Sequence, residues 1–209
     1  MTVRVAFGIT HVRININIMS QITVRELTPD LLPDWLDFFD HDAFADNPDW
    51  AACYCHFFHA DSAVKPFDDL SASENRAAAC ALIAAARLQG YLAYADGKPV
   101  GWCQAAPRVL IPNLQQDESL AVDDLERVGA VVCFTIAEPY RRRGIAGALL
   151  EAACDGFRAQ GLAVAEAYPR TNATDDAHNY HGPLALYLHA GFTVFKECEG
   201  LLIVRKSLS

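Results

Sequence analysis

Positive charge is scarce in this chain of 209 residues, where 17 lysines and arginines face 26 aspartates and glutamates, a formal net charge of −9. A chain this acidic lacks the broad basic surface that nonspecific nucleic-acid binding needs, so we expect no nucleic-acid partner. Long apolar runs are also missing. None approaches the roughly 18 residues that cross a bilayer, so we expect no membrane partner. Polar side chains interrupt residues 1–20, which do not resemble a signal peptide. These absences predict a cytoplasmic protein.

The seven cysteines form no paired pattern, because their number is odd and they are scattered along the chain. Several lie inside apolar runs, where a reduced cysteine behaves as a small hydrophobic residue. With no export signal, a reducing compartment is the better interpretation. Two cysteines and two histidines gather in NPDWAACYCHFFH, residues 47–59, but the C-x-C-H spacing lacks the second ligand pair of a zinc site. The sequence therefore predicts no metal.

The length and composition fit one globular domain. Apolar residues make up 52% and charged residues 21% of the chain, which is long enough to bury a sizeable core. We predict a domain over residues 19–209, because Met19 precedes a segment that resembles a natural domain start. Residues 1–18 then form an N-terminal extension, for which an added strand and a disordered segment are equal alternatives.

Hydrophobic patterning predicts the order strand, helices, three strands, helix, strand, helix and two strands, which is a mixed α/β sheet. Ser71 and Glu74 form a capping box that starts a helix, and Gly90 is placed to end it. Asp96-Gly97 and Glu199-Gly200 each mark a hairpin turn. Strands are expected at 22–28, on both sides of each hairpin turn, at 130–136 and at 162–169; helices within 31–44, 71–90, 143–160 and 182–192; and a polar, loop-like insert at 107–128.

The sequence EPYRRRGIAGALLEAA, Glu138–Ala153, concentrates positive charge where a helix begins. A buried strand, AVVCFTI, precedes it, and a glycine turn leads into the helix. The unpaired amides of a first helical turn point outward and the helix dipole adds about half a positive charge, so the arrangement suits an anion. Gly144, Ala146 and Gly147 leave room for a bulky phosphate. A solvated basic turn is the alternative; a P-loop is excluded because its consensus is absent.

Two short motifs resemble the GCN5-related N-acetyltransferase (GNAT) family. The arginine turn, R-x-x-G-x-A from Arg141, is similar to the family motif Q/R-x-x-G-x-G/A and follows a buried strand. The segment LYLHAGF, Leu186–Phe192, reproduces the family's Y-x-x-x-G-F. The likeness covers roughly residues 20–206. It implies a single-domain α/β fold with a mixed, mostly antiparallel sheet flanked by helices.

The resemblance also implies acetyl-CoA as the cosubstrate. Backbone groups at the end of the buried strand would hold its pantetheine arm, and the amides of the turn and first helical turn would cradle its pyrophosphate. The local positive charge would then face a multiply anionic cofactor. The cofactor-binding residues implied in this way are Phe134, Thr135, Ile136, Arg141, Arg142, Arg143, Gly144, Ile145, Ala146 and Gly147.

In this family an amine attacks the thioester carbonyl directly, and CoA leaves as a thiol. The resemblance makes Tyr187 the proton donor to the leaving sulfur; a core tyrosine without a chemical role is the alternative. Proton transfer from a phenol of pKa about 10 to a thiolate of about 8.5 is uphill by roughly 2 kcal/mol. We therefore expect Tyr187 to act mainly by hydrogen bonding to the developing charge.

The base that takes the proton of the amine is left open. Many family members carry a carboxylate on the strand before the arginine turn, and GAVVCFTI has none. Glu166 on the next strand is the leading candidate. His56 and His59 are alternatives because an unperturbed imidazole titrates near neutral pH, and a water chain is another. Deprotonating a lysine-like amine at pH 7 costs about 4.6 kcal/mol, whereas a peptide α-amine costs about 1 kcal/mol.

The aromatic segment 47–59 lies where the family builds its variable acceptor site. We predict that Trp50, Tyr54 and His56 line an acceptor pocket; simple packing of this loop onto the sheet is the alternative. Gln104 or Arg108, at the end of a neighbouring strand, could also contribute.

The sequence thus predicts an enzyme that moves an acetyl group from acetyl-CoA to a primary amine on a small molecule, a peptide N-terminus or a lysine. A non-catalytic acyl-CoA-binding module or sensor of the same fold is the alternative, because the strand carboxylate is missing. A nucleic-acid-modifying member is a weaker third alternative. Association into a homodimer stays open.

Overall fold

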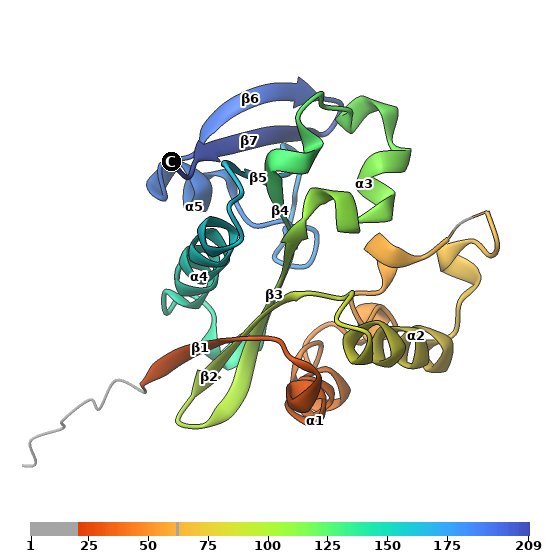
Figure 1. The fold of residues 1–209 in the computed structure, drawn as a ribbon. Helices are drawn as coiled ribbons and strands as arrows, with labels where there is room; N and C mark the ends of the chain where they lie inside the picture. Colours follow the sequence, from red (N-terminus) through yellow and green to blue (C-terminus); the bar gives the residue numbers. More distant parts are fainter. Residues whose placement is uncertain (1–20, 62) are drawn as a thin grey trace, which may run out of the picture.

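The structure is a computed structural model that describes residues 21–61 and 63–209 (Figure 1). Seven strands form one sheet in the order β1-β2-β3-β4-β5-β7-β6. Only β4 and β5 run parallel; every other neighbouring pair is antiparallel. The predicted single-domain, mostly antiparallel α/β sheet is confirmed. The predicted extension, 1–18, lies outside the described residues, and the domain boundary at residue 19 stays a prediction.

The order of elements agrees with the sequence pattern. The strands are β1 (Ile22–Glu26), β2 (Gly90–Ala95), β3 (Lys98–Pro107), β4 (Val128–Ile136), β5 (Val164–Ala167), β6 (Thr193–Cys198) and β7 (Leu201–Ser207), and the helices are α1 (Leu32–Asp37), α2 (Ala72–Ala84), α3 (Pro112–Gln116), α4 (Ile145–Ala159) and α5 (Leu184–His189).

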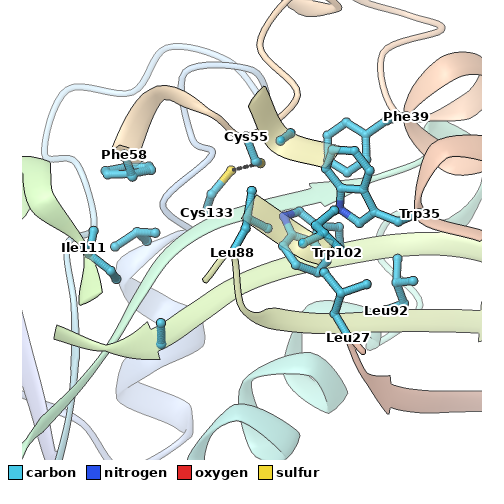
Figure 2. Close-up of a cluster of buried hydrophobic side chains, with 14 of the residues drawn as sticks. Leu27, Trp35, Phe39, Cys55, Phe58, Leu88, Leu92, Trp102, Ile111 and Cys133 are labelled. Atoms are coloured by element: carbon cyan, nitrogen blue, oxygen red, sulfur yellow. Dashed lines mark hydrogen bonds between the residues drawn. The ribbon is translucent and has the colours of Figure 1, made fainter. Parts of the chain in front are cut away.

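The sheet separates two apolar clusters, and Figure 1 shows α4 and α5 on the opposite face from α1 and α2. On the α1 and α2 face, Trp35 meets Trp102 edge to face with ring centroids 6.3 Å apart and stacks on Phe39 (Figure 2). On the other face, Leu149 and Phe157 of α4 pack against the sheet. The central strand β4 is covered on both faces, which explains its continuous apolar run.

The predicted start of α2 is correct, but its predicted end is not. Ser71 and Glu74 form the capping box of α2. That helix ends at Ala84 instead of near Gly90, which opens β2. Ala86 takes the left-handed conformation (φ 53°) that ends the helix, and the amide of Arg87 donates to the carbonyl of Leu82 (2.8 Å). The chain leaves the helix early because Leu88 must reach the core.

The insert between β3 and β4 is more ordered than its polar sequence suggests. It contains α3 and three short helical turns, and four of its side chains are buried: Arg108, Ile111, Leu114 and Leu120. The Arg108 guanidinium donates to the carbonyls of Leu114 (3.2 Å) and Leu120 (2.5 Å). One of these buried residues is an arginine, and five polar residues separate Leu114 from Leu120, so the sequence pattern predicted only a loop.

The strands β4 and β5 part in the middle of the sheet. Their last pair is Val131–Ala167; β5 ends there, whereas β4 continues to Ile136. On the other edge of β4, the register with β3 shifts between Gln104 and Ala105, which leaves Val132 in a bulge. Beyond Val131, the β5-facing edge of β4 has no strand partner among the described residues.

Close packing under β4 yields a test of the fold. A Cβ added at Gly129 would lie 2.4 Å from the ring of Phe157. We expect Gly129→Ala to lower the free energy of unfolding by about 1–3 kcal/mol, measured by urea denaturation, and Phe157→Leu in the same chain to recover part of the loss. Gly147→Ala meets nothing within 4 Å and should not destabilise the protein. Equal stability of the Gly129 and Gly147 variants would contradict this packing.

Candidate active site

The turn between β4 and α4 presents a row of free backbone amides. Arg142 (φ 59°) and Gly144 (φ 83°) both adopt the left-handed conformation, and α4 begins at the next residue. The first bond into the helix runs from the Ala148 amide to the Gly144 carbonyl (3.1 Å). Among the described residues, no acceptor pairs with the amides from Arg142 to Gly147. Such a curled run of N–H groups at a helix start suits an anion.

The three arginines of the turn have different roles. Arg141 points its Nε to the Ile136 carbonyl (3.0 Å) and binds both oxygens of Asp46 (2.7 and 2.9 Å). This pairing holds the pKa of Asp46 below its usual value. Arg141 therefore fixes the turn to the opposite loop, while Arg142 and Arg143 are exposed and available to a ligand, Arg143 lying over the Tyr140 ring at 5.4 Å.

A cavity of about 570 Å³ opens beside the free edge of β4. Three of the predicted cofactor residues, Phe134, Thr135 and Ile136, form one wall together with Arg141, and Trp50 stands on another. The structure thus brings the β4 edge and parts of the aromatic segment 47–59 to one cavity.

Two predicted acceptor residues lie outside the lining of this cavity. The Tyr54 hydroxyl donates to Asp40 (2.9 Å), and the His56 Nδ1 pairs with Asn75 (2.8 Å). Both side chains hold the loop against neighbouring helical segments, whereas the alternative left open by the sequence was packing onto the sheet. Of the three residues, the structure brings only Trp50 to the cavity.

Sequence reasoning missed several lining residues. Three cysteines line the cavity, and the Sγ atoms of Cys55 and Cys133 lie 3.5 Å apart (Figure 2). Burial raises the pKa of the Cys53 thiol to about 12, so this thiol stays neutral and acts as apolar lining. Strand alternation could have placed Cys133 and Thr135 on one face. The rim was not predictable in this way; it includes Asp49, Asp68, Arg170, Asp176 and Tyr180. In the described part of the chain, no three ligating side chains are grouped to hold a metal ion.

Glu166, the leading candidate for the base, is enclosed in a buried ion cluster. Its carboxylate accepts from Arg108, from the Tyr168 hydroxyl (2.5 Å) and from Arg205 Nε (2.7 Å), and Arg205 continues to Asp124. Glu166 is absent from the cavity lining. The cluster ties β5 to β7 and to the insert, so the position of Glu166 supports a structural role, and the same holds for Arg108.

Two histidines are also held away from the cavity. The His59 Nε2 lies 2.9 Å from the Gln104 amide nitrogen. The candidate base His59 and the candidate acceptor-site residue Gln104 are therefore bonded to each other. Burial lowers the pKa of His59 to about 4. His181, which the sequence did not single out, also has its pKa lowered to about 4 by burial, while the Val132 carbonyl acts in the opposite direction. Both imidazoles are neutral at pH 7.

Tyr187 is absent from the cavity lining and packs in the apolar cluster on the α4 face of the sheet. Its side chain is fully buried, which raises the pKa of the phenol well above its usual value. Its hydroxyl donates to the carbonyl of His181. Tyr180 precedes His181 in the loop, and its carbonyl accepts from the Phe134 amide (2.6 Å). The structure thus brings the predicted acid and the predicted cofactor strand to the same loop segment.

The comparisons with known proteins agree with this geometry. A family model described as the acetyltransferase (GNAT) family matches residues 25–184. The chain belongs to this family. Among curated proteins, none is similar to this GNAT chain. Within residues 21–61 and 63–209, every helix is too short or too polar to traverse a lipid bilayer.

Solved structures show the same GNAT fold at low identity. The PaiA N-acetyltransferase of Thermoplasma acidophilum, in complex with coenzyme A, is 12% identical over 90% of this chain and 99% of its own, with a TM-score of 0.55. A GNAT acetyltransferase of Streptococcus pneumoniae is 16% identical over 90% and 100%, with a TM-score of 0.51. YncA of Salmonella typhimurium, with its cofactor acetyl-CoA, is 14% identical over 90% and 94%, also with a TM-score of 0.51.

The ion cluster separates a structural from a catalytic role for Glu166. We expect Glu166→Gln to leave Arg108 buried without its anion and to lower the free energy of unfolding by about 3–5 kcal/mol, measured by urea denaturation. Glu151→Gln, an exposed change of the same kind on α4, should stay within about 0.5 kcal/mol of the parent. A Glu166 variant of full stability that has lost its acetyl transfer would instead support the base.

Proposed function

We propose that this GNAT protein transfers an acetyl group from acetyl-CoA to a primary amine by direct attack. The observation that supports it most is that three features lie on one stretch of chain: the free amides from Arg142 to Gly147, the β4 edge that has no strand partner beyond Val131 among the described residues, and the cavity lined by Phe134, Thr135 and Ile136. These features offer an elongated anionic thioester a site for its phosphates, a strand edge for its arm and a cavity for its reactive end. Two structures similar in fold hold coenzyme A or acetyl-CoA.

The residues present fit the cosubstrate at both ends. Amides without internal acceptors, helped by the exposed Arg142 and Arg143, would bind the pyrophosphate. The β4 edge would hydrogen bond to the pantetheine amides as a further strand does. At the cavity, the amine nitrogen forms a bond to the thioester carbon, the C–S bond breaks, and the sulfur gains a proton from the Tyr187 hydroxyl. The proton that the acylated nitrogen then loses restores this hydroxyl through water.

The proton that a cationic acceptor loses on entry leaves by another path. With Glu166, His56 and His59 outside the lining, the described carboxylates nearest to a bound amine are those of the rim, Asp49 and Asp68 among them. We propose that water carries the proton to this rim. A rim of this charge favours an acceptor that arrives as a cation and loses its proton on entry, and an α-amine does so at a lower cost than a lysine.

A non-catalytic acyl-CoA-binding module is the second candidate. Two observations favour it: β4 carries no carboxylate, and the Tyr187 hydroxyl is bonded to the protein itself. Binding and turnover therefore need separate tests.

Cofactor binding is tested by thermal shift with saturating acetyl-CoA. A ligand at about 100 times its dissociation constant adds roughly 2.7 kcal/mol of stability, so we expect a clear rise in Tm that Gly144→Glu abolishes, because a carboxylate then faces the phosphates. Gly161→Glu is the matched control. It has a similar positive φ (78° against 83°) and equally open surroundings, but lies at the far end of α4. No shift in the parent, or an equal loss in both variants, would contradict the cofactor site.

Catalysis is tested by Tyr187→Phe. We expect acetyl-CoA to bind normally and amine acetylation to fall by about 100-fold or more, because the leaving sulfur loses its donor. Binding is measured by calorimetry and turnover by release of free thiol. Unchanged turnover would remove Tyr187 from the mechanism, and absent turnover in the parent across a panel of amines would favour the binding module.

A further inference from the structure

One loop segment, Tyr180–Gly182, occupies both donors that the proposed reaction needs. The Tyr180 carbonyl accepts from the Phe134 amide (2.6 Å), and the His181 carbonyl accepts from the Tyr187 hydroxyl. Gly182 fits tightly behind them, since a Cβ added there would lie 3.1 Å from the Tyr187 hydroxyl and 3.3 Å from the Phe134 ring. The segment therefore fills the space where β4 and β5 part.

The outer end of this segment is held by polar and aromatic contacts at the cavity rim. Arg170 donates to the Tyr180 hydroxyl (3.0 Å) and its guanidinium lies 5.1 Å from the centre of the Tyr180 ring. The Trp50 ring packs on the same tyrosine, with centroids 5.6 Å apart. All three side chains are only partly buried. Contacts of this kind open locally at a much lower cost than the core of the sheet.

The two donors have one proton each. An amide N–H or a phenol O–H makes one good hydrogen bond at a time, so a ligand that uses these protons must displace the carbonyls that hold them. In direct acyl transfer the thioester needs a donor at its carbonyl oxygen, where charge develops, and another at its sulfur. The amide of Phe134 lies at the strand edge and bonds to Tyr180, and the Tyr187 hydroxyl bonds to the next residue of the same segment, His181. The loop carbonyls and the thioester thus compete for the same two protons.

We propose that Tyr180–Gly182 is a latch that holds the Phe134 amide and the Tyr187 hydroxyl in the free protein, and that acetyl-CoA displaces it. This inference rests on the proposed function of the cleft. It predicts that only the fraction of molecules with an open latch binds the cofactor, so the measured dissociation constant is the intrinsic value divided by that fraction. Loosening the latch should then tighten cofactor binding, which is the opposite of what damage to a binding residue does.

The test is the affinity for coenzyme A, measured by calorimetry on the full chain. Tyr180→Phe keeps the ring, the backbone and the charge, and removes only the hydroxyl that Arg170 holds. Loss of one hydrogen bond of ordinary strength shifts an equilibrium by about two- to tenfold, so we expect coenzyme A to bind about two- to tenfold more tightly. Tyr94→Phe is the matched control. It also loses one hydroxyl hydrogen bond, to Asp34 (2.8 Å), but lies on β2, away from the cavity, and should leave the affinity unchanged.

The freed Arg170 could also raise affinity by attracting the anionic cofactor, and salt distinguishes the two causes. The Debye length falls from about 10 Å at 0.1 M to about 3 Å at 1 M salt, so a gain from attraction fades whereas a gain from latch opening persists. A gain in Tyr180→Phe that remains at high salt supports the latch. Unchanged or weaker binding, or a gain that disappears with salt, overturns it while the proposed function stands. If the parent does not bind coenzyme A, both fall together.

Discussion

The rest of the site depends on the parting of β4 and β5 after the Val131–Ala167 pair. A strand inside a sheet normally forms hydrogen bonds along both edges. Where the pairing with β5 ends early, backbone groups of β4 lose their strand partner in the protein interior, which is costly unless other groups form these hydrogen bonds. The chain supplies substitutes from loops: the Tyr180 carbonyl accepts from the Phe134 amide, and the Arg141 guanidinium donates to the Ile136 carbonyl. Because these partners belong to loops, a ligand can replace them without disturbing the sheet.

The buried cluster around Glu166 holds β5 one residue before its last pair with β4. The carboxylate faces Arg108 and Arg205, so β5 is bonded sideways to β7 and to the insert before β4. A buried ion cluster contributes little net stability compared with apolar packing of the same volume, but losing one member is expensive because a charge is left without a partner. We infer that its value here is geometric, since it joins β5, β7 and the insert next to the point where β5 ends.

The sequence predicted those parts of the site that local geometry determines. The arginine turn could be identified because a buried strand, a glycine with φ 83° and a helix start follow one another along the chain. The surroundings of Glu166 could not, because its arginine partners are 58 and 39 residues away in sequence. The aromatic segment contributes to the cavity lining, but tertiary partners such as Asn75 and Asp40 decide which of its side chains enter the cavity, and sequence periodicity does not reveal these partners. The role of Tyr180 was invisible for another reason: its bond to β4 uses the main chain, which every residue possesses.

The two ends of the cofactor cleft satisfy their donors in different ways, and this difference suggests an order of events. The amides of the arginine turn lie at an exposed surface, where water satisfies them, so the phosphate end is ready in the free protein. The Phe134 amide and the Tyr187 hydroxyl lie in a buried space, where an unpaired donor costs about 1–3 kcal/mol, so the free protein bonds them internally. A cofactor that approaches this surface can bind first through its phosphates, at a site that needs no rearrangement. The site for the thioester then forms as the loop carbonyls release the Phe134 amide and the Tyr187 hydroxyl, so these donors become available only once the cofactor is already held.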